Sequence, residues 1–165
     1  KPMTLSVESA DRMIAAAQRS QRLLTVDHNR WFDPVVRRAV GLIESGAIGE
    51  VVGVEVLQGI LAGEGQVEGG SQFQWSSRLP GGALFDSAPH PAYLLRGLLG
   101  PIRELQVMSD TDAEHGIREL RALARGDGAL GVLTISQRAR PFSNTLRVMG
   151  SEATLAVDLN NMTLV

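Results

Sequence analysis

The chain has 165 residues, enough for one well-packed core, and its 44% hydrophobic and 21% charged residues are typical of a globular protein in water. A net charge of −2 at pH 7 favours neither nucleic acid nor an anionic membrane as a partner. The chain has no cysteine, which excludes disulfides and thiolate metal sites, and no apolar run near the roughly 18 residues of a membrane span, so we expect a cytoplasmic protein.

The first residues predict a helix followed by a short strand. Ser6 or Ser9 can cap the helix, and its apolar stripe consists of Val7, Ala10, Met13, Ile14 and Ala17. Leu23–Val26 is expected to be a buried strand that ends in the polar residues 27–30. A helix and a strand with no strand before them resemble the last unit of a doubly wound sheet, in which ligands bind beyond the carboxyl ends of the strands. We interpret His28, at this strand end, as a structural hydrogen-bonding residue.

A second helix and a longer strand follow, and then a loop. The spacing predicts the helix over Pro34–Ser45, ended by Gly46, and the strand over Val51–Ile60. The composition of Ala62–Ser77, rich in Gly, Glu, Gln and Ser, indicates a loop. Its Gly63–Gly69 segment is not a dinucleotide loop, because the third glycine is one residue too far along and two glutamates would repel a pyrophosphate.

The segment Leu79–Gly100 carries the most unusual chemistry. Apolar residues recur at helical spacing after the break at residues 80–82, and this pattern predicts a buried helix. Asp86 and His90 are four residues apart, so on a helix they share a face. A carboxylate beside an imidazole sets its tautomer and raises its basicity, as a general base requires. The alternative is structural, with Asp86 or Ser87 as the N-cap of a helix, Pro89 at its first position and a surface histidine.

The rest of the chain predicts strands with little helix between them. The mixed charges around Ile117–Leu123 indicate a short helix or an exposed connection, and we expect His115 to face solvent. This pattern favours an α+β fold with an open, mainly antiparallel sheet and helices on one face. The expected strands are Ile102–Met108, Ala129–Ser136, Asn144–Met149 and Thr154–Val157.

Several motifs, in the right order, resemble one enzyme family. Gly81–His90 resembles the GG-x-x-x-D-x-x-x-H segment of the Gfo/Idh/MocA family of NAD(P)-dependent oxidoreductases. Lys1-Pro2 is similar to the end of that family's Glu-Lys-Pro motif, Phe32–Val51 to its helix and following strand, and Val148–Leu155 to its glycine-containing turn. One departure is visible: many relatives carry an acidic residue three positions after the histidine, where this chain has Tyr93.

The resemblance implies a domain organisation and an activity. Residues 1–30 would be the end of a Rossmann-type dinucleotide-binding domain, and residues 31–165 a truncated substrate-binding and dimerisation domain. We therefore expect the chain to be a piece of a longer protein, inactive by itself, that forms a homo-oligomer. The whole enzyme would transfer a hydride between NAD or NADP and a CH–OH group of a sugar, a polyol or a related alcohol.

The resemblance also implies roles for single residues. His90 would exchange the hydroxyl proton, Asp86 would hold and tune its imidazole, and Lys1 would stabilise charge on the reacting oxygen. Trp75 and Arg78 would contact the substrate together with His90, although Trp75 is equally well interpreted as a lid on the core. The residues implied to lie at the cofactor are Lys1, Pro2, Asn29 and Arg30.

Two other functions compete with the oxidoreductase. The first is a non-catalytic carbohydrate-binding or assembly domain of the same fold. The second makes Asp86, His90 and His28 metal ligands, which we consider improbable because no second carboxylate is near and relatives need no metal. We expect no metal.

Overall fold

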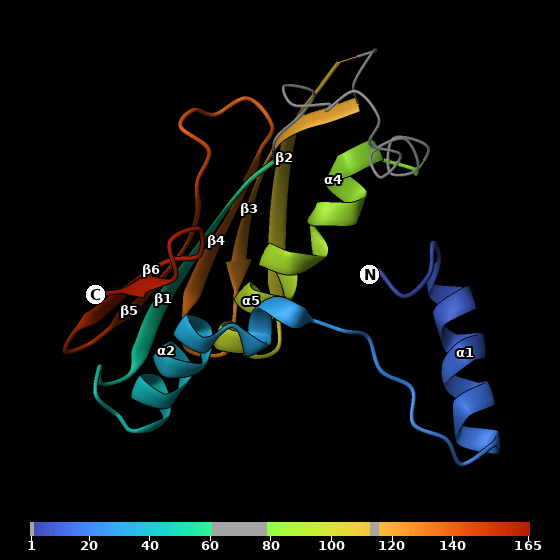
Figure 1. The fold of residues 1–165 in the computed structure, drawn as a ribbon, viewed down its shortest axis with the longest axis horizontal. Helices are drawn as coiled ribbons and strands as arrows, with labels where there is room; N and C mark the ends of the chain where they lie inside the picture. The colour runs from blue at the N-terminus through green and yellow to red at the C-terminus, as the bar shows by residue number, and fades with distance from the viewer. Residues whose placement is uncertain (1, 61–78, 113–115) are drawn as a thin grey trace.

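The computed structural model describes residues 2–60, 79–112 and 116–165. Most of these residues belong to one seven-stranded sheet and the helices on one of its faces, whereas the first helix, Val7–Arg19, lies apart from the sheet (Figure 1). The strand order is β2-β3-β4-β1-β5-β6-β7. Neighbouring strands are antiparallel except for β1 and β4, which are parallel. The expected α+β fold with an open, mainly antiparallel sheet is confirmed. The strands are β1 (Val51–Gly59), β2 (Glu104–Asp112), β3 (Gly116–Arg125), β4 (Leu130–Ser136), β5 (Asn144–Gly150), β6 (Thr154–Asp158) and β7 (Thr163–Leu164).

The helices follow local signals in the sequence. Helix α2 begins at Pro34, because the first amides of a helix have no hydrogen-bond partner within it and proline therefore loses no bond there. The helix ends before Gly46, whose φ of 75° is in the left-handed region. The expected second helix is thus confirmed. Ser6 caps the first helix, because its Oγ accepts a hydrogen bond from the amide of Ser9 at 3.2 Å. The helical elements are α1 (Val7–Arg19), the 3₁₀ turn η1 (Asn29–Phe32), α2 (Pro34–Glu44), α4 (Gly82–Ser87) and α5 (Pro89–Leu99).

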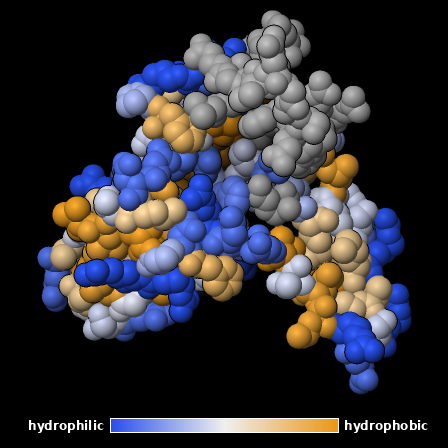
Figure 2. Space-filling model, viewed as in Figure 1, coloured by the Kyte–Doolittle hydropathy of each residue, from blue (hydrophilic) through white to orange (hydrophobic). Residues whose placement is uncertain are grey.

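The strand expected at Leu23–Val26 is wrong. These residues run between α1 and η1 without strand structure, and Leu23 is fully exposed. The backbone groups of a strand need a paired neighbour, and no described strand pairs with this segment. Helix α1 likewise has no buried residue, and Figure 2 shows hydrophobic surface on it, at the right of the view, beside hydrophilic surface. None of the described helices is long and apolar enough to cross a membrane.

The helix or exposed connection expected at Ile117–Leu123 is also wrong, because these residues belong to β3. Ala122 and Ala124 are buried on the helix-covered face, whereas Leu123 and Arg125 are exposed on the other. The charges that concealed this alternation form pairs along the sheet, such as Arg125 with Glu104 of β2 at 3.4 Å. Strand β2 also continues past the expected end to Asp112, and His115 lies outside the described residues.

The core lies between the sheet and helices α5 and α2. Helix α5 covers the parallel pair of strands and buries Leu94, Leu95 and Leu99 there. The approach is close, because a Cβ atom placed on Gly131 of β4 would stand 2.8 Å from Cδ1 of Leu95. The core strands supply mainly branched side chains: Val54, Val56, Leu133, Ile135, Leu146 and Val148.

Gly150 provides a test of the packing between β5 and the residues after α2. A Cβ atom on Gly150 would collide with the backbone carbonyl oxygen of Ile48, which is buried. We therefore expect Gly150→Ala to lower the free energy of unfolding by about 1–3 kcal/mol, measured by urea denaturation. Gly41→Ala is the matched control, since nothing lies within 4 Å of that position in α2, and helix propensity should make it neutral or stabilising by up to about 1 kcal/mol. Equal midpoints for both variants would contradict this account.

Candidate functional site

The segment that carries Asp86 and His90 folds as two helices rather than one. Pro89 and Pro91 have no amide to donate, so the helical hydrogen-bond ladder breaks at Ala88 between α4 and α5. Pro89 occupies the first turn of α5, as the structural interpretation expects, but the N-cap is Ala88 and neither Asp86 nor Ser87. Asp86 and His90 are therefore half-buried on successive helices. Their pairing remains a prediction.

The imidazole of His90 is held by Tyr93 on the next turn of α5. Nδ1 of His90 lies 2.9 Å from Oη of Tyr93, and the two rings meet edge to face. The same phenol oxygen accepts a hydrogen bond from the backbone amide of Arg30, also at 2.9 Å. One oxygen atom thus joins the predicted acid/base residue to the segment that holds the predicted cofactor residues Asn29 and Arg30.

Aromatic contacts also join the segment around η1 to helix α5, and we call this meeting point the junction. The ring of His28 stacks on Tyr93 with 4.3 Å between centroids and 17° between planes. The indole of Trp31 lies so close to Gly97 of α5 that a Cβ atom there would be 2.5 Å from it. These contacts tie η1 to α5, as expected of a structural role for His28.

A hollow of about 650 Å³ opens beside this junction. Its walls are aromatic and polar, and they come from the segment before α2 and from α5. The residues that line it are Thr25, Val26, Asp27, His28, Trp31, Phe32, Tyr93, Arg96 and Gly97.

Charge around the junction is balanced locally. The guanidinium of Arg30 pairs with the carboxylate of Asp33 at 3.2 Å, which holds its side chain beside the turn. Partial burial raises the pKa of Tyr93 to about 12, while the amide and charge of Arg30 oppose that rise. Tyr93 is therefore a neutral phenol throughout the physiological pH range.

The structure describes only part of the predicted site. Lys1, Trp75 and Arg78 lie outside the described residues. Pro2 is half-buried in the segment ahead of α1. The other predicted residues, in η1, α4 and α5, are described.

Sequence reasoning missed Tyr93, which it recorded only as a departure from the family pattern. The signal that could have identified it is its spacing, because residues three apart on a helix are neighbours. It is also the chain's single tyrosine.

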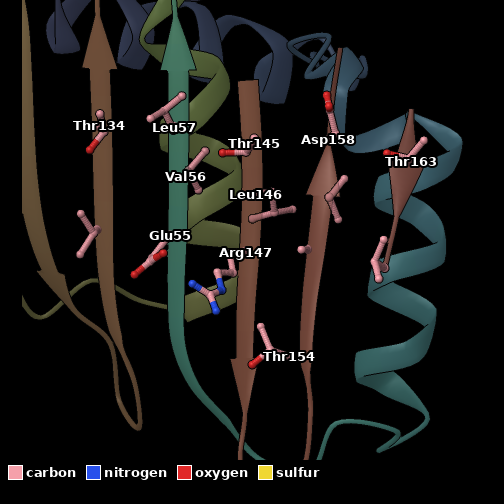
Figure 3. Close-up of a pocket in the computed structure, with 14 residues that line it drawn as sticks. Glu55, Val56, Leu57, Thr134, Thr145, Leu146, Arg147, Thr154, Asp158 and Thr163 are labelled. Carbon is pink, nitrogen blue, oxygen red and sulfur yellow. The ribbon is translucent and has the colours of Figure 1, made fainter. Parts of the chain in front are cut away.

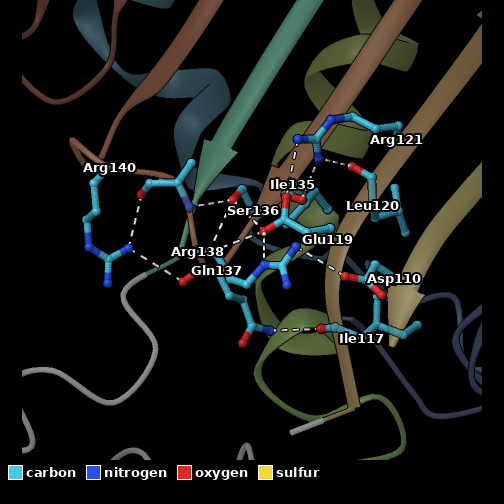
Figure 4. A network of polar contacts seen from close by, with 11 residues as sticks. Asp110, Ile117, Glu119, Leu120, Arg121, Ile135, Ser136, Gln137, Arg138 and Arg140 are labelled. Atoms are coloured by element: carbon cyan, nitrogen blue, oxygen red, sulfur yellow. Dashed lines mark hydrogen bonds and ion pairs between the residues drawn. The ribbon is translucent and has the colours of Figure 1, made fainter. Parts of the chain in front are cut away.

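A second polar cluster lies where β3 and β4 meet the following turn (Figure 4). Glu119 accepts hydrogen bonds from Oγ of Ser136 at 2.8 Å and from Arg121 at 3.2 Å, and Arg138 bridges it to Asp110. Burial raises the pKa of Glu119, but these hydrogen bonds outweigh it and hold the pKa below its usual value. A carboxylate so fully compensated ties strands together and is a poor acid or base.

The metal alternative finds no support among the described residues. No three His, Cys, Asp or Glu side chains in this part of the chain come together as a cation site would require. Asp86, His90 and His28 therefore do not form such a set.

The open face of the sheet carries a second hollow, of about 800 Å³ (Figure 3). Threonines from β4, β5, β6 and β7 surround it. Glu55 of β1 lies opposite Arg147 of β5 in the strand register.

The raised pKa of Tyr93 can be measured directly. We expect the ultraviolet absorbance of the phenolate to appear with a pKa of about 12 in the folded protein, against about 10 in urea. The titration of Tyr93→Phe, subtracted from that of the native protein, assigns the signal. Because the folded state holds this proton more tightly, stability should be unaffected below pH 10 and fall as the pH rises through 12. A folded-state value near 10 would show that the phenol is exposed to solvent.

Known proteins are similar to this chain in sequence and in fold. D-xylose 1-dehydrogenase (NADP(+)) from Haloarcula marismortui is 29% identical over 170 residues, which cover 96% of this chain and 45% of that protein. The WlbA dehydrogenase from Bordetella pertussis, solved in complex with NADH and UDP-GlcNAcA, superposes with a TM-score of 0.80 at 22% identity, covering 96% of this chain and 50% of that one. An NAD binding oxidoreductase from Klebsiella pneumoniae superposes with a TM-score of 0.82 at 27% identity, covering 99% and 48%.

The chain spans about half the length of these proteins. The family model described as the GFO/IDH/MocA C-terminal domain matches residues 36–156, which are most of the chain. The chain therefore belongs to the GFO/IDH/MocA family.

Proposed function

We propose that the protein that carries this chain is an oxidoreductase that transfers a hydride between NAD or NADP and a hydroxyl-bearing carbon of a sugar, a polyol or a related alcohol. The observation that carries the proposal is the hydrogen bond between Oη of Tyr93 and the imidazole of His90, since the same oxygen also accepts a hydrogen bond from the amide of Arg30. A proton-exchanging group is thereby fixed beside the segment proposed to bind the cofactor. The dehydrogenases among the relatives support this class of reaction.

The residues around the hollow fit the nicotinamide end of such a cofactor. The aromatic rings of His28, Trp31 and Tyr93 offer a wall for a flat heterocycle. Asn29, which follows His28 and is exposed, can hydrogen-bond a carboxamide. In the described residues, no glycine-rich turn opens a long helix, as binding of the pyrophosphate requires. We therefore assign only the nicotinamide end to this chain. When bound, the nicotinamide ring supplies a hydride acceptor.

His90 carries the proton chemistry of the proposed reaction. Oxidation breaks the C–H bond with transfer of a hydride and breaks the O–H bond with transfer of a proton, which leaves a carbonyl. The imidazole of His90 takes that proton and becomes an imidazolium, and it returns the proton in the reverse reaction.

Five further residues complete the proposed site. Asp86 stabilises the positive charge that the imidazole gains with the proton, and Lys1 stabilises charge on the reacting oxygen and, with Pro2, adjoins the cofactor. Trp75 and Arg78 contact the substrate. A non-catalytic role is not favoured, since the relatives described above are enzymes.

Removing the imidazole tests the proposal. In the protein expressed from its complete gene, we expect His90→Ala to lower kcat by about 10²- to 10⁴-fold, with KM and cofactor affinity changed much less. The assay follows the absorbance of reduced nicotinamide with D-xylose and a panel of sugars and polyols, and NAD⁺ or NADP⁺.

His28→Ala is the comparison variant, because it removes an imidazole that contacts Tyr93 and lines the proposed cofactor wall but leaves the imidazole of His90 in place. It should lower kcat by less than about tenfold, since a stacking contact is worth roughly 0.5–1.5 kcal/mol. Unchanged turnover in His90→Ala would remove His90 from the mechanism.

We also propose that two copies assemble through the open face of the sheet. Leu123 and Val132 are register partners there and are 48% and 37% exposed, and Glu55 continues the same row toward Arg147. Such an apolar surface next to charges of both signs suits a second copy, because a two-fold axis can bring the carboxylate of one copy to the guanidinium of the other.

Light scattering tests this assembly. A Leu123→Glu/Val132→Glu double variant should be a monomer at concentrations where the native protein is a dimer or larger, because it places four like charges in the interface. Met162→Glu, in the turn between β6 and β7 and outside the row that contains Leu123 and Val132, should assemble normally. A native protein that is a monomer at high concentration would refute the proposal.

A further inference from the structure

We propose that Tyr93 is the positioning residue for His90, holding a hydrogen on Nδ1 of the ring so that Nε2 exchanges the substrate proton. The inference rests on the function proposed above and adds the residue and the atom on which the proton transfer depends. It concerns the position at which this chain departs from the acidic residue of many relatives.

The phenol oxygen is fixed from outside helix α5. The amide of Arg30 donates to Oη of Tyr93 at 2.9 Å, and the ring of His28 stacks on the phenol at 4.3 Å. Both partners belong to the segment that enters η1, so the oxygen cannot move with α5 alone. A fixed oxygen 2.9 Å from Nδ1 restrains rotation of the imidazole about its side-chain bonds.

The hydrogen-bonding capacity of a phenol fits this role. Oη has two lone pairs and one hydrogen, and the amide of Arg30 occupies one lone pair. The second lone pair can accept the Nδ1–H of His90. Burial raises the pKa of Tyr93 to about 12, so the phenol remains neutral and never competes for the proton of the reaction.

The same hydrogen bond is present before and after the proton transfer. A histidine that acts as a base at Nε2 must carry its hydrogen on Nδ1, and the imidazolium that results also carries one there. The Nδ1–H···Oη bond therefore persists while Nε2 gains and loses the proton. A ring with its hydrogen on Nε2 would present no lone pair to the substrate at that atom, so the tautomer decides whether His90 can be a base.

The hydrogen bond also connects two parts of the proposed site. Because Arg30 follows Asn29 directly, the oxygen that orients His90 also fixes the backbone of the proposed cofactor segment. Loss of the Tyr93 hydroxyl should therefore loosen the imidazole of His90 and the backbone at Arg30, although the ring of Tyr93 remains.

The test compares the native protein with Tyr93→Phe, both expressed from the complete gene. The variant keeps the ring on His28 and removes only the oxygen. Nitrogen-15 NMR of the imidazoles, assigned with His90→Ala, should show His90 as the Nδ1–H tautomer in the native protein and a shift toward Nε2–H in the variant. Exchange of the Arg30 amide hydrogen should be faster in the variant. Turnover of D-xylose or of another sugar in the panel should show kcat about tenfold lower, with KM within about twofold.

Leu98→Ala is the matched control for a merely structural effect. Leu98 is half-buried against the core on the same helix, so its truncation should lower the melting temperature while the tautomer of His90 and kcat stay close to native. An Nε2–H tautomer in the native protein, or a tautomer unchanged in Tyr93→Phe, would overturn the inference. So would native kcat in Tyr93→Phe.

The two proposals fail in different ways. Absence of dehydrogenase activity from the native protein refutes the proposed function, and the NMR measurement still decides whether Tyr93 holds His90, because it needs no turnover. Activity that Tyr93→Phe leaves intact refutes the inference alone.

Discussion

The arrangement of this domain depends on the close packing of helix α5 on the parallel strands β1 and β4. Leu95 and Leu99 fill the space above Gly131, where any side chain on the strand would push the helix away. Leu94, on the same helix, is almost completely buried. A helix held this tightly presents the side chains of its first turn at a defined height and angle. The packing of the core therefore sets the positions of His90 and Tyr93.

The packing of α5 positions only the residues that this helix contributes to the site. The segment before α2 is positioned by a hydrogen bond to Tyr93. The segment before α2 has little buried surface of its own, and it reaches the helix through Tyr93 and through the contact of Trp31 with Gly97. The hydrogen bond from the backbone amide of residue 30 does not depend on the side chain there. It therefore positions the backbone of this segment against helix α5. The local pairing of Arg30 with Asp33 then neutralises the charge next to the phenol.

The sequence predicts those elements whose signals are local. Helix α2 follows from Pro34 and its apolar spacing, and strand β1 from its branched residues. Leu23–Val26 shows why strands are harder, because a strand depends on a partner that may lie anywhere in the chain. In β3, charged residues that pair across the sheet concealed the alternation.

For the candidate site the same distinction holds. The spacing of Asp86 and His90 is visible in the sequence, but the break at Ala88 depends on how two prolines are accommodated. The contact between Tyr93 and Arg30 joins residues 63 positions apart, and no local pattern encodes it. Residues such as Lys1 are recognised only through family resemblance, since a lone lysine carries no signal of its function.

The position of β1 at the centre of the sheet has a consequence for how the chain folds. Its two neighbours, β4 and β5, both follow α5 in the chain, so β1 leaves the ribosome long before either of them. Until they arrive, its branched apolar residues Val54 and Val56 have no strand beside them. Closing such long loops costs entropy before any contact compensates for it, and topologies of this kind fold slowly. We therefore expect folding to begin in the local antiparallel pairs β2–β3, β3–β4 and β5–β6, with the pairing of β1 formed later and β1 exposed to aggregation until then.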